Sequence, residues 1–264
     1  MKRFTGKTVL ITGGGTGIGA AIAHQFASEG AQVALMGRRA ELLKNVASQI
    51  GGLILQADAA DSAQVAIAMA HLHDRFGPLD VLVCNAGGFG FGTLENNSDA
   101  DWNASVQANL NTAMVTSRAA MPDLCTQRGN ILMMSSIAGL AAGPEACGYV
   151  TMKHALIGLA KSIVRDYGPK GVRCNTICPG WVRTGMADSE MAELMKRRGL
   201  ASIEEAYALV THDVPLGRPA MPADVAHAAA FLCSDAAAMI SGAVLTVDGG
   251  ATVVDVPTIA FAAT

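Results

Sequence analysis

Charged and aromatic residues are scarce in this sequence of 264 residues. Charged side chains make up 16% of it and aromatic ones 5%, and the net charge is only −3. Such a composition lacks the basic surface with which proteins bind nucleic acid. Long hydrophobic runs are missing too, since no uninterrupted apolar stretch reaches the length that spans a bilayer. We therefore expect neither a nucleic-acid partner nor a membrane segment.

Metal-binding and disulfide patterns are absent as well. The six cysteines and six histidines are scattered, and Cys174 and Cys178 lack the spacing of a CxxC pair. This distribution predicts no metal site and reduced, mostly buried thiols. Residues 1–7 contain no apolar segment of the signal-peptide type, so we expect a cytoplasmic protein.

Hydrophobic residues, by contrast, make up 51% of the chain. They can fill a large core and still leave a fairly apolar surface, part of which we expect an oligomer to cover. No long linker rich in proline, serine or charge interrupts the sequence. Residues 1–264 are therefore expected to form a single dinucleotide-binding and catalytic domain.

Seven short apolar runs alternate with helical patterns along the chain. Each run is nearly continuous in hydrophobic residues, which is typical of strands buried on both faces of a parallel sheet. The alternation predicts an α/β fold, a doubly wound Rossmann-type sheet of about seven parallel strands flanked by helices. The strand candidates are residues 8–12, 32–36, 53–58, 80–85, 130–135, 172–178 and 243–247. The helix candidates are residues 18–29, 40–49, 62–76, 102–124 and 149–167.

Two segments lie outside this repeating pattern. Residues 184–212 are rich in Met, Ala and Glu and predict one or two helices after a strand's carboxyl end, where a substrate lid is commonly inserted. The apolar tail, residues 252–264, is expected to pack against a partner subunit. A disordered end is the alternative for the tail.

A glycine-rich loop joins the first strand candidate to the first helix candidate. Glycines allow a sharp turn and let a pyrophosphate approach the backbone, while the N–H groups of the helix N-terminus face the anion. The strand–loop–helix context predicts a dinucleotide site, with a purely structural turn as the alternative. The loop reads Gly13-Gly14-Gly15-Thr16-Gly17-Ile18-Gly19, with Gly-x-x-x-Gly-x-Gly spacing instead of the more familiar Gly-x-Gly-x-x-Gly.

The end of the second strand candidate favours NADP(H) over NAD(H). A carboxylate at this place would bond the ribose 2′-hydroxyl of NAD, but the chain has Arg38 and Arg39 here. Two cations at the start of a helix oppose its dipole, and a bound 2′-phosphate would reverse that effect. The alternative is that both arginines are solvated surface charges.

A tyrosine and a lysine, Tyr149 and Lys153, are spaced to share one face of a helix. An ammonium about 4 Å away could lower a tyrosine pKa by about three units from its ordinary value near 10. Ser136 follows the fifth strand candidate and could hold the substrate oxygen during proton exchange, whereas its neighbour Ser135 is interpreted as structural. Asn109 stands in a predicted helix interior, which disfavours asparagine, so we expect it to have a specific partner, with a polar surface position as the alternative.

These motifs together resemble the short-chain dehydrogenase/reductase family, from Lys7 to about Gly250. Most of them are weak individually, but their order along the chain is highly specific. They are Thr12-Gly13-x-x-x-Gly17-Ile18-Gly19, Asn85-Ala86-Gly87, Asn109, Ser136, Tyr149-x-x-x-Lys153, Pro179-Gly180 and Asp248-Gly249-Gly250.

The resemblance implies a role for each residue of the predicted site. Tyr149 would be the general acid in reduction and the base in oxidation, and Lys153 would lower its pKa and hold the nicotinamide ribose. Ser136 would orient the carbonyl, and Asn109 would hold a water that links Lys153 to bulk solvent. The cofactor would also contact Gly13, Thr16, Gly17, Ile18 and Gly19, then Asp58 at the adenine, Asn85 and Gly87 at the adenosine ribose, and Pro179, Gly180, Val182 and Thr184 at the nicotinamide.

The family also implies a homotetramer with twofold interfaces, one of them formed by the last strand and the tail. One departure concerns the cofactor. Many NADP-dependent members carry a basic residue where this chain has Thr16, so the preference for NADP rests on Arg38 and Arg39 alone.

The predicted function is that of an NADPH-dependent carbonyl reductase for a small apolar ketone, whose substrate would contact Ser136, Ala138, Trp181 and Met186. An NAD-dependent alcohol dehydrogenase of the same family is the alternative. A lyase, an epimerase or a non-catalytic dinucleotide sensor is disfavoured because the glycine loop and the lysine are intact.

Overall fold

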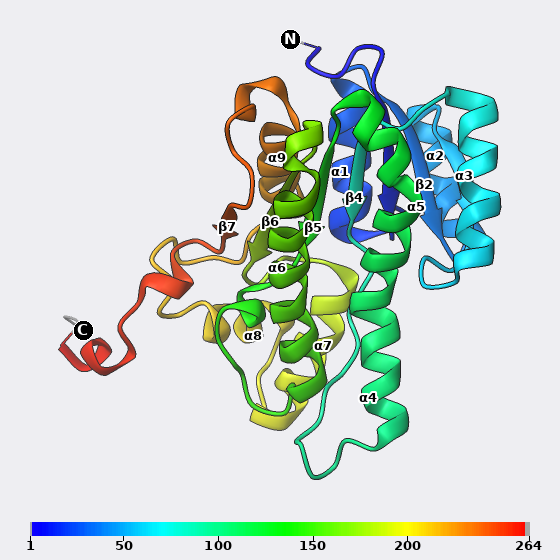
Figure 1. Ribbon diagram of the computed structural model, residues 1–264. Coiled ribbons are helices and arrows are strands. Elements are labelled where there is room, and N and C mark those ends of the chain that lie inside the picture. Colours follow the sequence, from blue (N-terminus) through cyan, green and yellow to red (C-terminus); the bar gives the residue numbers. More distant parts are fainter. Residues whose placement is uncertain (1, 262–264) are drawn as a thin grey trace.

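The parallel sheet predicted from the apolar runs is present. The structure is a computed structural model that describes residues 2–261. Its seven strands are all parallel and follow the order β3-β2-β1-β4-β5-β6-β7 (Figure 1). The order reverses between β1 and β4, and in sheets of this kind ligands bind beyond the strand ends at such a point. The strands are β1 (Thr8–Thr12), β2 (Gln32–Gly37), β3 (Leu53–Gln56), β4 (Val81–Cys84), β5 (Asn130–Met134), β6 (Arg173–Pro179) and β7 (Val244–Val247).

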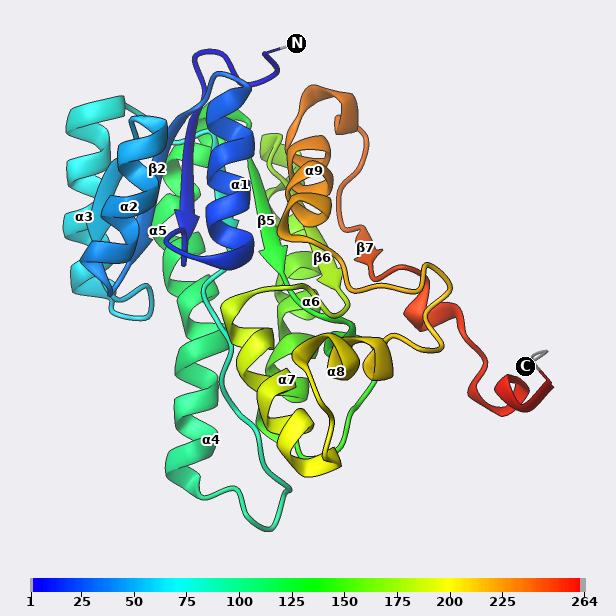
Figure 2. The ribbon, with the colours of Figure 1, turned by 180° about the vertical axis from the view of Figure 1, so that it is seen from behind.

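Helices cover both faces of the sheet, which explains why the central strands are apolar along their whole length. One hydrophobic core joins one face to α3 (Ser62–Phe76), α5 (Thr112–Gln127) and α6 (Cys147–Tyr167). A second core joins the other face to α1 (Gly17–Ser28), α2 (Ala40–Ile50) and α9 (Pro222–Cys233). Figure 1 shows the first layer in front of the sheet, and Figure 2 shows the second from behind.

Two helices differ from the prediction. The single helix expected over residues 102–124 is divided into α4 (Asp99–Ser105), the π-helix η1 (Val106–Asn111) and α5. Helix α9 was not predicted, because its many alanines obscure an apolar stripe. Its start does carry a sequence signal, Pro222 in the first turn and a carboxylate, Asp224, that accepts a hydrogen bond from the Met221 N–H.

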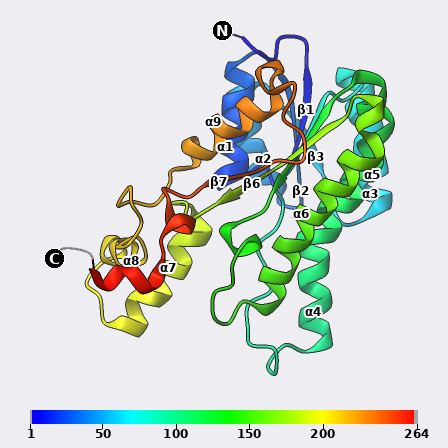
Figure 3. The same ribbon diagram turned by 60° about the vertical axis from the view of Figure 1, so that its left-hand side comes forward.

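The segment expected as a lid forms two helices, α7 (Gly185–Arg198) and α8 (Ile203–Val210). They lie beyond the carboxyl ends of the strands (Figure 3) and share a small buried cluster that is separate from the two sheet cores. The cluster consists of Ala187, Met191, Ala206 and Tyr207. Met191, one of the lid methionines, therefore packs inside the lid.

The chain after β7 runs away from the sheet (Figure 1) and exposes apolar side chains, among them Val256 and Phe261. Residues 262–264 of the predicted interface tail lie outside the described part. Across residues 2–261, no helix combines the length and the apolarity needed to cross a bilayer.

Candidate active site

Helix α6 places Tyr149 and Lys153 one turn apart at the carboxyl end of β5. Lys153 is almost fully buried, and its Nζ donates a hydrogen bond to the Met134 carbonyl at 2.9 Å. The same Nζ lies 5.4 Å from the centroid of the Tyr149 ring. The predicted helical pair is therefore present, with the lysine fixed to the last residue of β5.

The expected lowering of the Tyr149 pKa is not found in this structure. Burial raises the pKa of Tyr149, and the hydrogen bond with Ser136 opposes the rise only in part. Burial also lowers the pKa of Lys153 to about 8. The expectation counted the attraction of the ammonium and left out the cost of burying both charges, so the lowering of the Tyr149 pKa by Lys153 stays a prediction. A phenol in this environment is protonated near neutral pH and can donate a proton.

The two serines after β5 have different partners. Ser135 is buried, and its hydroxyl donates to the Lys153 carbonyl at 2.8 Å, which supports the structural role inferred for it. Ser136 lies near Tyr149 and acts to lower its pKa, and its Oγ accepts from the Ala138 N–H at 3.1 Å. Ser136 and Tyr149 thus bring two hydroxyls together beside Lys153.

Asn109 has the specific partners that its position predicted. It is fully buried in η1, and its Oδ1 accepts from the Gly88 N–H at 2.8 Å while its Nδ2 donates to the Phe89 carbonyl at 2.7 Å. A Cβ added at Gly87 would lie 3.0 Å from Asn109 Oδ1 and 3.3 Å from Lys153 Nζ. Asn109 and Lys153 therefore converge on a space that glycine keeps open. The water relay assigned to Asn109 stays a prediction.

The glycine loop has the backbone conformation that its sequence predicted. Gly13 and Gly17 have φ of +66° and +53°, in the region that favours glycine. A Cβ at Gly19 would collide with the Gly13 carbonyl. Asn85, which was expected at the adenosine ribose, donates from Nδ2 to the Thr12 carbonyl at 3.1 Å and so holds the loop. Its contact with a ribose stays a prediction.

The adenosine end of the predicted site has free cationic groups. Arg38 and Arg39 are exposed at the start of α2, and neither forms an ion pair with any other residue between 2 and 261. Asp58 follows β3, and its Oδ1 accepts from the Ala60 N–H at 3.0 Å. Thr16 precedes α1 without a side-chain cap, so the helix N-terminus is open to an anion.

The predicted nicotinamide end of the site involves the segment after β6. A Cβ at Gly180 would lie 3.0 Å from Asp248 Cα, so glycine is needed where the ends of β6 and β7 meet. Val182 is buried and forms a bridge with Ala220. Thr184 caps α7, and its methyl lies 3.2 Å from where a Gly17 Cβ would be. Between the glycine loop and Gly87, glycines leave the backbone uncovered by side chains. The residues present can therefore hold a dinucleotide. Ile18, partly buried in the first turn of α1, packs against the core below the loop.

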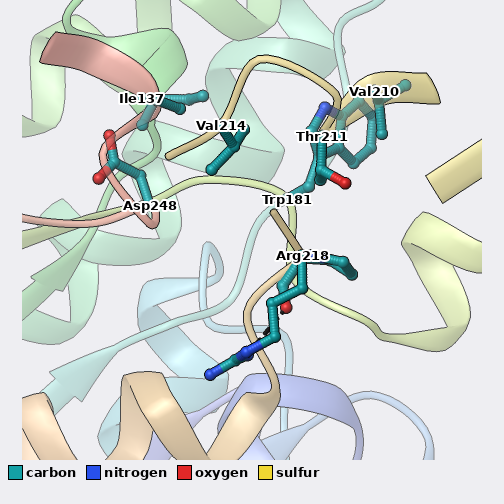
Figure 4. A pocket seen from close by; sticks show the side chains of 9 residues that line it. Ile137, Trp181, Val210, Thr211, Val214, Arg218 and Asp248 are labelled. Atoms are coloured by element: carbon teal, nitrogen blue, oxygen red, sulfur yellow. Dashed lines mark hydrogen bonds between the residues drawn. The ribbon is translucent and has the colours of Figure 1, made fainter. Parts of the chain in front are cut away.

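Trp181 and Met186, both predicted substrate residues, lie in different places. Met186 is exposed and reaches over Gly88, where an added Cβ would collide with its methyl group. Trp181 lines a cavity of about 120 Å³ between the lid and the end of β7, together with Arg218 and Asp248 (Figure 4). Ile137 lines the same cavity and sits between Ser136 and Ala138 in sequence.

Two residues that act on Tyr149 were missed in the sequence. Phe91 stacks on Tyr149, with the ring centroids 5.4 Å apart and the planes inclined by 19°. The signal for Phe91 is the alternation of glycine and phenylalanine after Gly87. Glu190 of α7 is partly buried, and its charge contributes to the raised pKa of Tyr149. Its signal is its place one helical turn after Met186.

Comparison with known proteins agrees with this geometry. A family model described as enoyl-(acyl carrier protein) reductase matches residues 13–252. Protein MoaE of Klebsiella aerogenes is 49% identical over 258 residues, which cover 97% of this chain and 99% of the relative. Oxidoreductase UcpA of Salmonella typhimurium is 36% identical, with coverage of 96% and 97%. The crystal structure of levodione reductase superposes with a TM-score of 0.90 at 28% identity, covering 96% of this chain and 100% of that one.

Proposed function

The chain belongs to the short-chain dehydrogenase/reductase family, whose members are oxidoreductases of alcohols and ketones with NAD(P)(H), and we propose that it is an NADPH-dependent carbonyl reductase. The observation that carries the proposal is that Ser136 and Tyr149 lie together beside the buried Lys153, at the carboxyl end of β5. A protonated acid at this point serves the reduction of a carbonyl.

The residues that would hold the cofactor follow from the cradles described above. The glycine loop and the open start of α1 would take the pyrophosphate, and Lys153 would take the nicotinamide ribose. Arg38 and Arg39 support NADPH, since both cations lack ion-pair partners within residues 2–261 and stand where a 2′-phosphate would bind.

The proposed roles of Ser136, Tyr149 and Lys153 centre on the proton that is transferred to the carbonyl oxygen. When bound, the dinucleotide would supply a hydride to the carbonyl carbon. Ser136 Oγ holds the carbonyl oxygen, and Tyr149 Oη donates the proton that completes the alcohol. The ammonium of Lys153 then stabilises the phenolate left on Tyr149 until it is protonated again. In the oxidative direction the same proton returns from the alcohol to Tyr149.

The substrate side is proposed to be largely apolar. Phe91 stacks on Tyr149, Met186 lies over Gly88, and Ala138 is two residues after Ser136. Residues 184–212 would act as the lid over this space. The exposed apolar residues after β7 support a second proposal, that the tail covers a partner subunit in a homotetramer.

The cofactor assignment is tested by titrating the protein with NADPH and NADH and repeating both titrations with Arg38→Ala. We expect the variant to bind NADPH about 10- to 100-fold more weakly, because a charge-assisted contact is lost, and to bind NADH nearly as before. Arg75→Ala removes an exposed arginine on α3 and serves as the matched control.

Each result of the titrations has a defined meaning. Stronger NADH binding that Arg38→Ala does not change would overturn the NADPH assignment and favour an NAD-dependent alcohol dehydrogenase. Binding of neither dinucleotide would contradict the proposed oxidoreductase function itself.

A further inference from the structure

The first turn of α6 is capped by a loop and not by a side chain. The helix begins at Cys147, where no side chain accepts a hydrogen bond from its N–H groups. The Tyr149 N–H donates to the Gly90 carbonyl at 2.8 Å. The Cys147 N–H donates to the Gly92 carbonyl at 3.2 Å. These carbonyls satisfy donors that a helix N-terminus leaves free, so the loop at residues 88–92 is joined directly to the turn that carries Tyr149.

Glycine at position 90 lets the loop approach the helix this closely. Gly90 has a φ of +117°, in the region that favours glycine. A Cβ there would lie 2.7 Å from the Tyr149 backbone nitrogen and would collide with Ser105 Oγ. The other side of the loop is bound as well, since Asn109 Nδ2 donates to the Phe89 carbonyl at 2.7 Å. The loop backbone is therefore fixed next to Tyr149 from both α6 and η1.

Phe91 lies between the two loop residues that are bonded to α6. Its ring stacks on the ring of Tyr149, with the centroids 5.4 Å apart and the planes inclined by 19°. The side chain is 52% exposed, so burial in a core does not explain its position. The χ2 torsion of a tyrosine is broad, which means that the plane of the Tyr149 ring depends on what packs against it. An offset-stacked aromatic neighbour favours one plane over the others.

We propose that Phe91 is a positioning residue that holds the plane of the Tyr149 ring and so keeps the phenol hydroxyl beside Ser136 for proton transfer. The assignment rests on the proposed function, because it concerns the phenol that would donate the proton. Without the stack, the proton donor and the glycine loop are still present, but the hydroxyl spends less time in the reactive position. The turnover number should therefore fall while binding stays unchanged.

The kinetic test compares Phe91→Leu, which removes the ring but keeps an apolar side chain, with Phe91→Tyr, which keeps the ring. Reduction of 1-phenyl-1-propanone and of 1-cyclohexyl-1-propanone is measured with saturating NADPH and, separately, NADH. The two ketones have similar shapes, and only the first is aromatic. We expect Phe91→Leu to lower kcat about 3- to 10-fold for both ketones, the effect of losing one aromatic pair, with KM unchanged within about twofold. Phe91→Tyr should retain the wild-type kcat.

Phe89→Leu is the matched control. The Phe89 side chain is exposed on the same loop, and within residues 2–261 its ring stacks on no other aromatic ring. This variant should keep the wild-type kcat within about twofold. An equal fall of kcat in Phe89→Leu would overturn the stack as the cause and assign it to the loop as a whole. A higher KM for the phenyl ketone alone, with kcat unchanged, would overturn the positioning role and make Phe91 a substrate contact.

Nuclear magnetic resonance of the protein with ring-labelled tyrosine separates this proposal from the proposed function, because it requires no turnover. The Tyr149 signal, assigned with Tyr149→Phe, lies in the ring current of Phe91. We expect it to move in Phe91→Leu and to stay in Phe89→Leu. A moved signal in a protein that reduces neither ketone would support the positioning role and contradict the proposed reduction of apolar ketones. Turnover by wild type with an unmoved signal, or with a kcat that Phe91→Leu does not change, would overturn the positioning role and leave the reductase function standing.

Discussion

The catalytic floor, from the glycine loop to α6, and the lid helices α7 and α8 are held together in different ways. In the floor, the bond from Lys153 to Met134 is buried, and the bond from Asn85 to Thr12 joins residues 73 positions apart in the chain. In the lid, the bond from the Tyr207 hydroxyl to Asp188 is only partly buried, and the Arg183–Glu204 pair is exposed. We infer that the floor fixes the reacting atoms, while side chains of α7 and α8, the proposed lid, can vary without disturbing them.

Burial supports the same distinction. The floor rests on two cores that extend across both faces of the sheet, whereas the lid has a separate cluster of four buried residues. Local opening costs less where few apolar contacts are broken. We infer that substitutions in the floor act on chemistry and cofactor binding, and that substitutions in the lid act on substrate choice. The predictions below test this division.

The largest effect is expected at the phenol of the floor. Tyr149→Phe removes the proton donor, so kcat should fall by about 1,000-fold, within the range of general acid catalysis. Dinucleotide affinity should change by less than about twofold, because the ring and its packing remain. Tyr167→Phe makes the same change at the far end of α6 and should keep wild-type turnover. Equal turnover by Tyr149→Phe and wild type would contradict the proposed mechanism.

The next effect concerns the backbone of the floor. In Gly19→Ala, the new methyl meets the Gly13 carbonyl and lies 2.6 Å from Asn85 Nδ2, so the loop must shift. We expect the free energy of unfolding to fall by about 2 to 3 kcal/mol, the cost of overpacking, and dinucleotide binding to weaken at least tenfold. Urea unfolding and cofactor titration measure the two effects. Unchanged binding would show that the loop does not hold the dinucleotide.

A third prediction concerns the free energy that burial of the Lys153 ammonium costs. Burial lowers the pKa of Lys153 from 10.5 to about 8. Below pH 8 both the folded and the unfolded chain carry this proton, so the full cost of the buried charge, at most about 3 kcal/mol, is present. Lys153→Met removes that cost but also a hydrogen bond of about 1 kcal/mol to the Met134 carbonyl. The variant should therefore be inactive yet about 2 kcal/mol more stable at pH 7.

The pH dependence of the free energy of unfolding provides a control for this prediction. Between pH 8 and 10.5 the unfolded chain binds more protons at this side chain than the folded chain, so wild-type stability rises with pH. The advantage of Lys153→Met should shrink in this interval, as measured by urea unfolding at pH 7 and pH 10. Lys161→Met, at an exposed position of the same helix, should show no such change. A variant less stable than wild type at both pH values would refute the argument.

The division between floor and lid also describes what the sequence could predict. The strands of the floor were predicted within about two residues because burial on both faces leaves a continuous apolar signal. Tyr149 and Lys153 were predicted because helical spacing is a local property. The glycine loop was predictable because its φ values exclude other residues.

The missed features depend on contacts between distant residues. The π-helix arises where Asn109 bonds the loop at Gly88, which lies 21 residues earlier in the chain. The raised pKa of Tyr149 depends on burial that no spacing rule measures. Glu190 is partly buried and its neighbour Glu193 on α7 is exposed, a difference that spacing along the chain does not reveal. Side-chain environment, and with it substrate choice, is therefore the part that only the folded chain defines.

The smallest effect is expected in the lid, at the glycine that begins α7. A Cβ added at Gly185 meets no atom within 4 Å, and its φ is not in the left-handed region. Gly185→Ala should therefore raise the free energy of unfolding by about 0.4 to 1 kcal/mol, because the unfolded chain loses freedom and nothing in the fold must move. In a domain of this size that is a rise of about 1 to 4 °C in Tm, measurable by calorimetry. The same Gly→Ala change would then stabilise the lid and destabilise the floor at Gly19. A loss of stability at Gly185 would mean that the lid is packed as tightly as the floor, and the division argued above would fail.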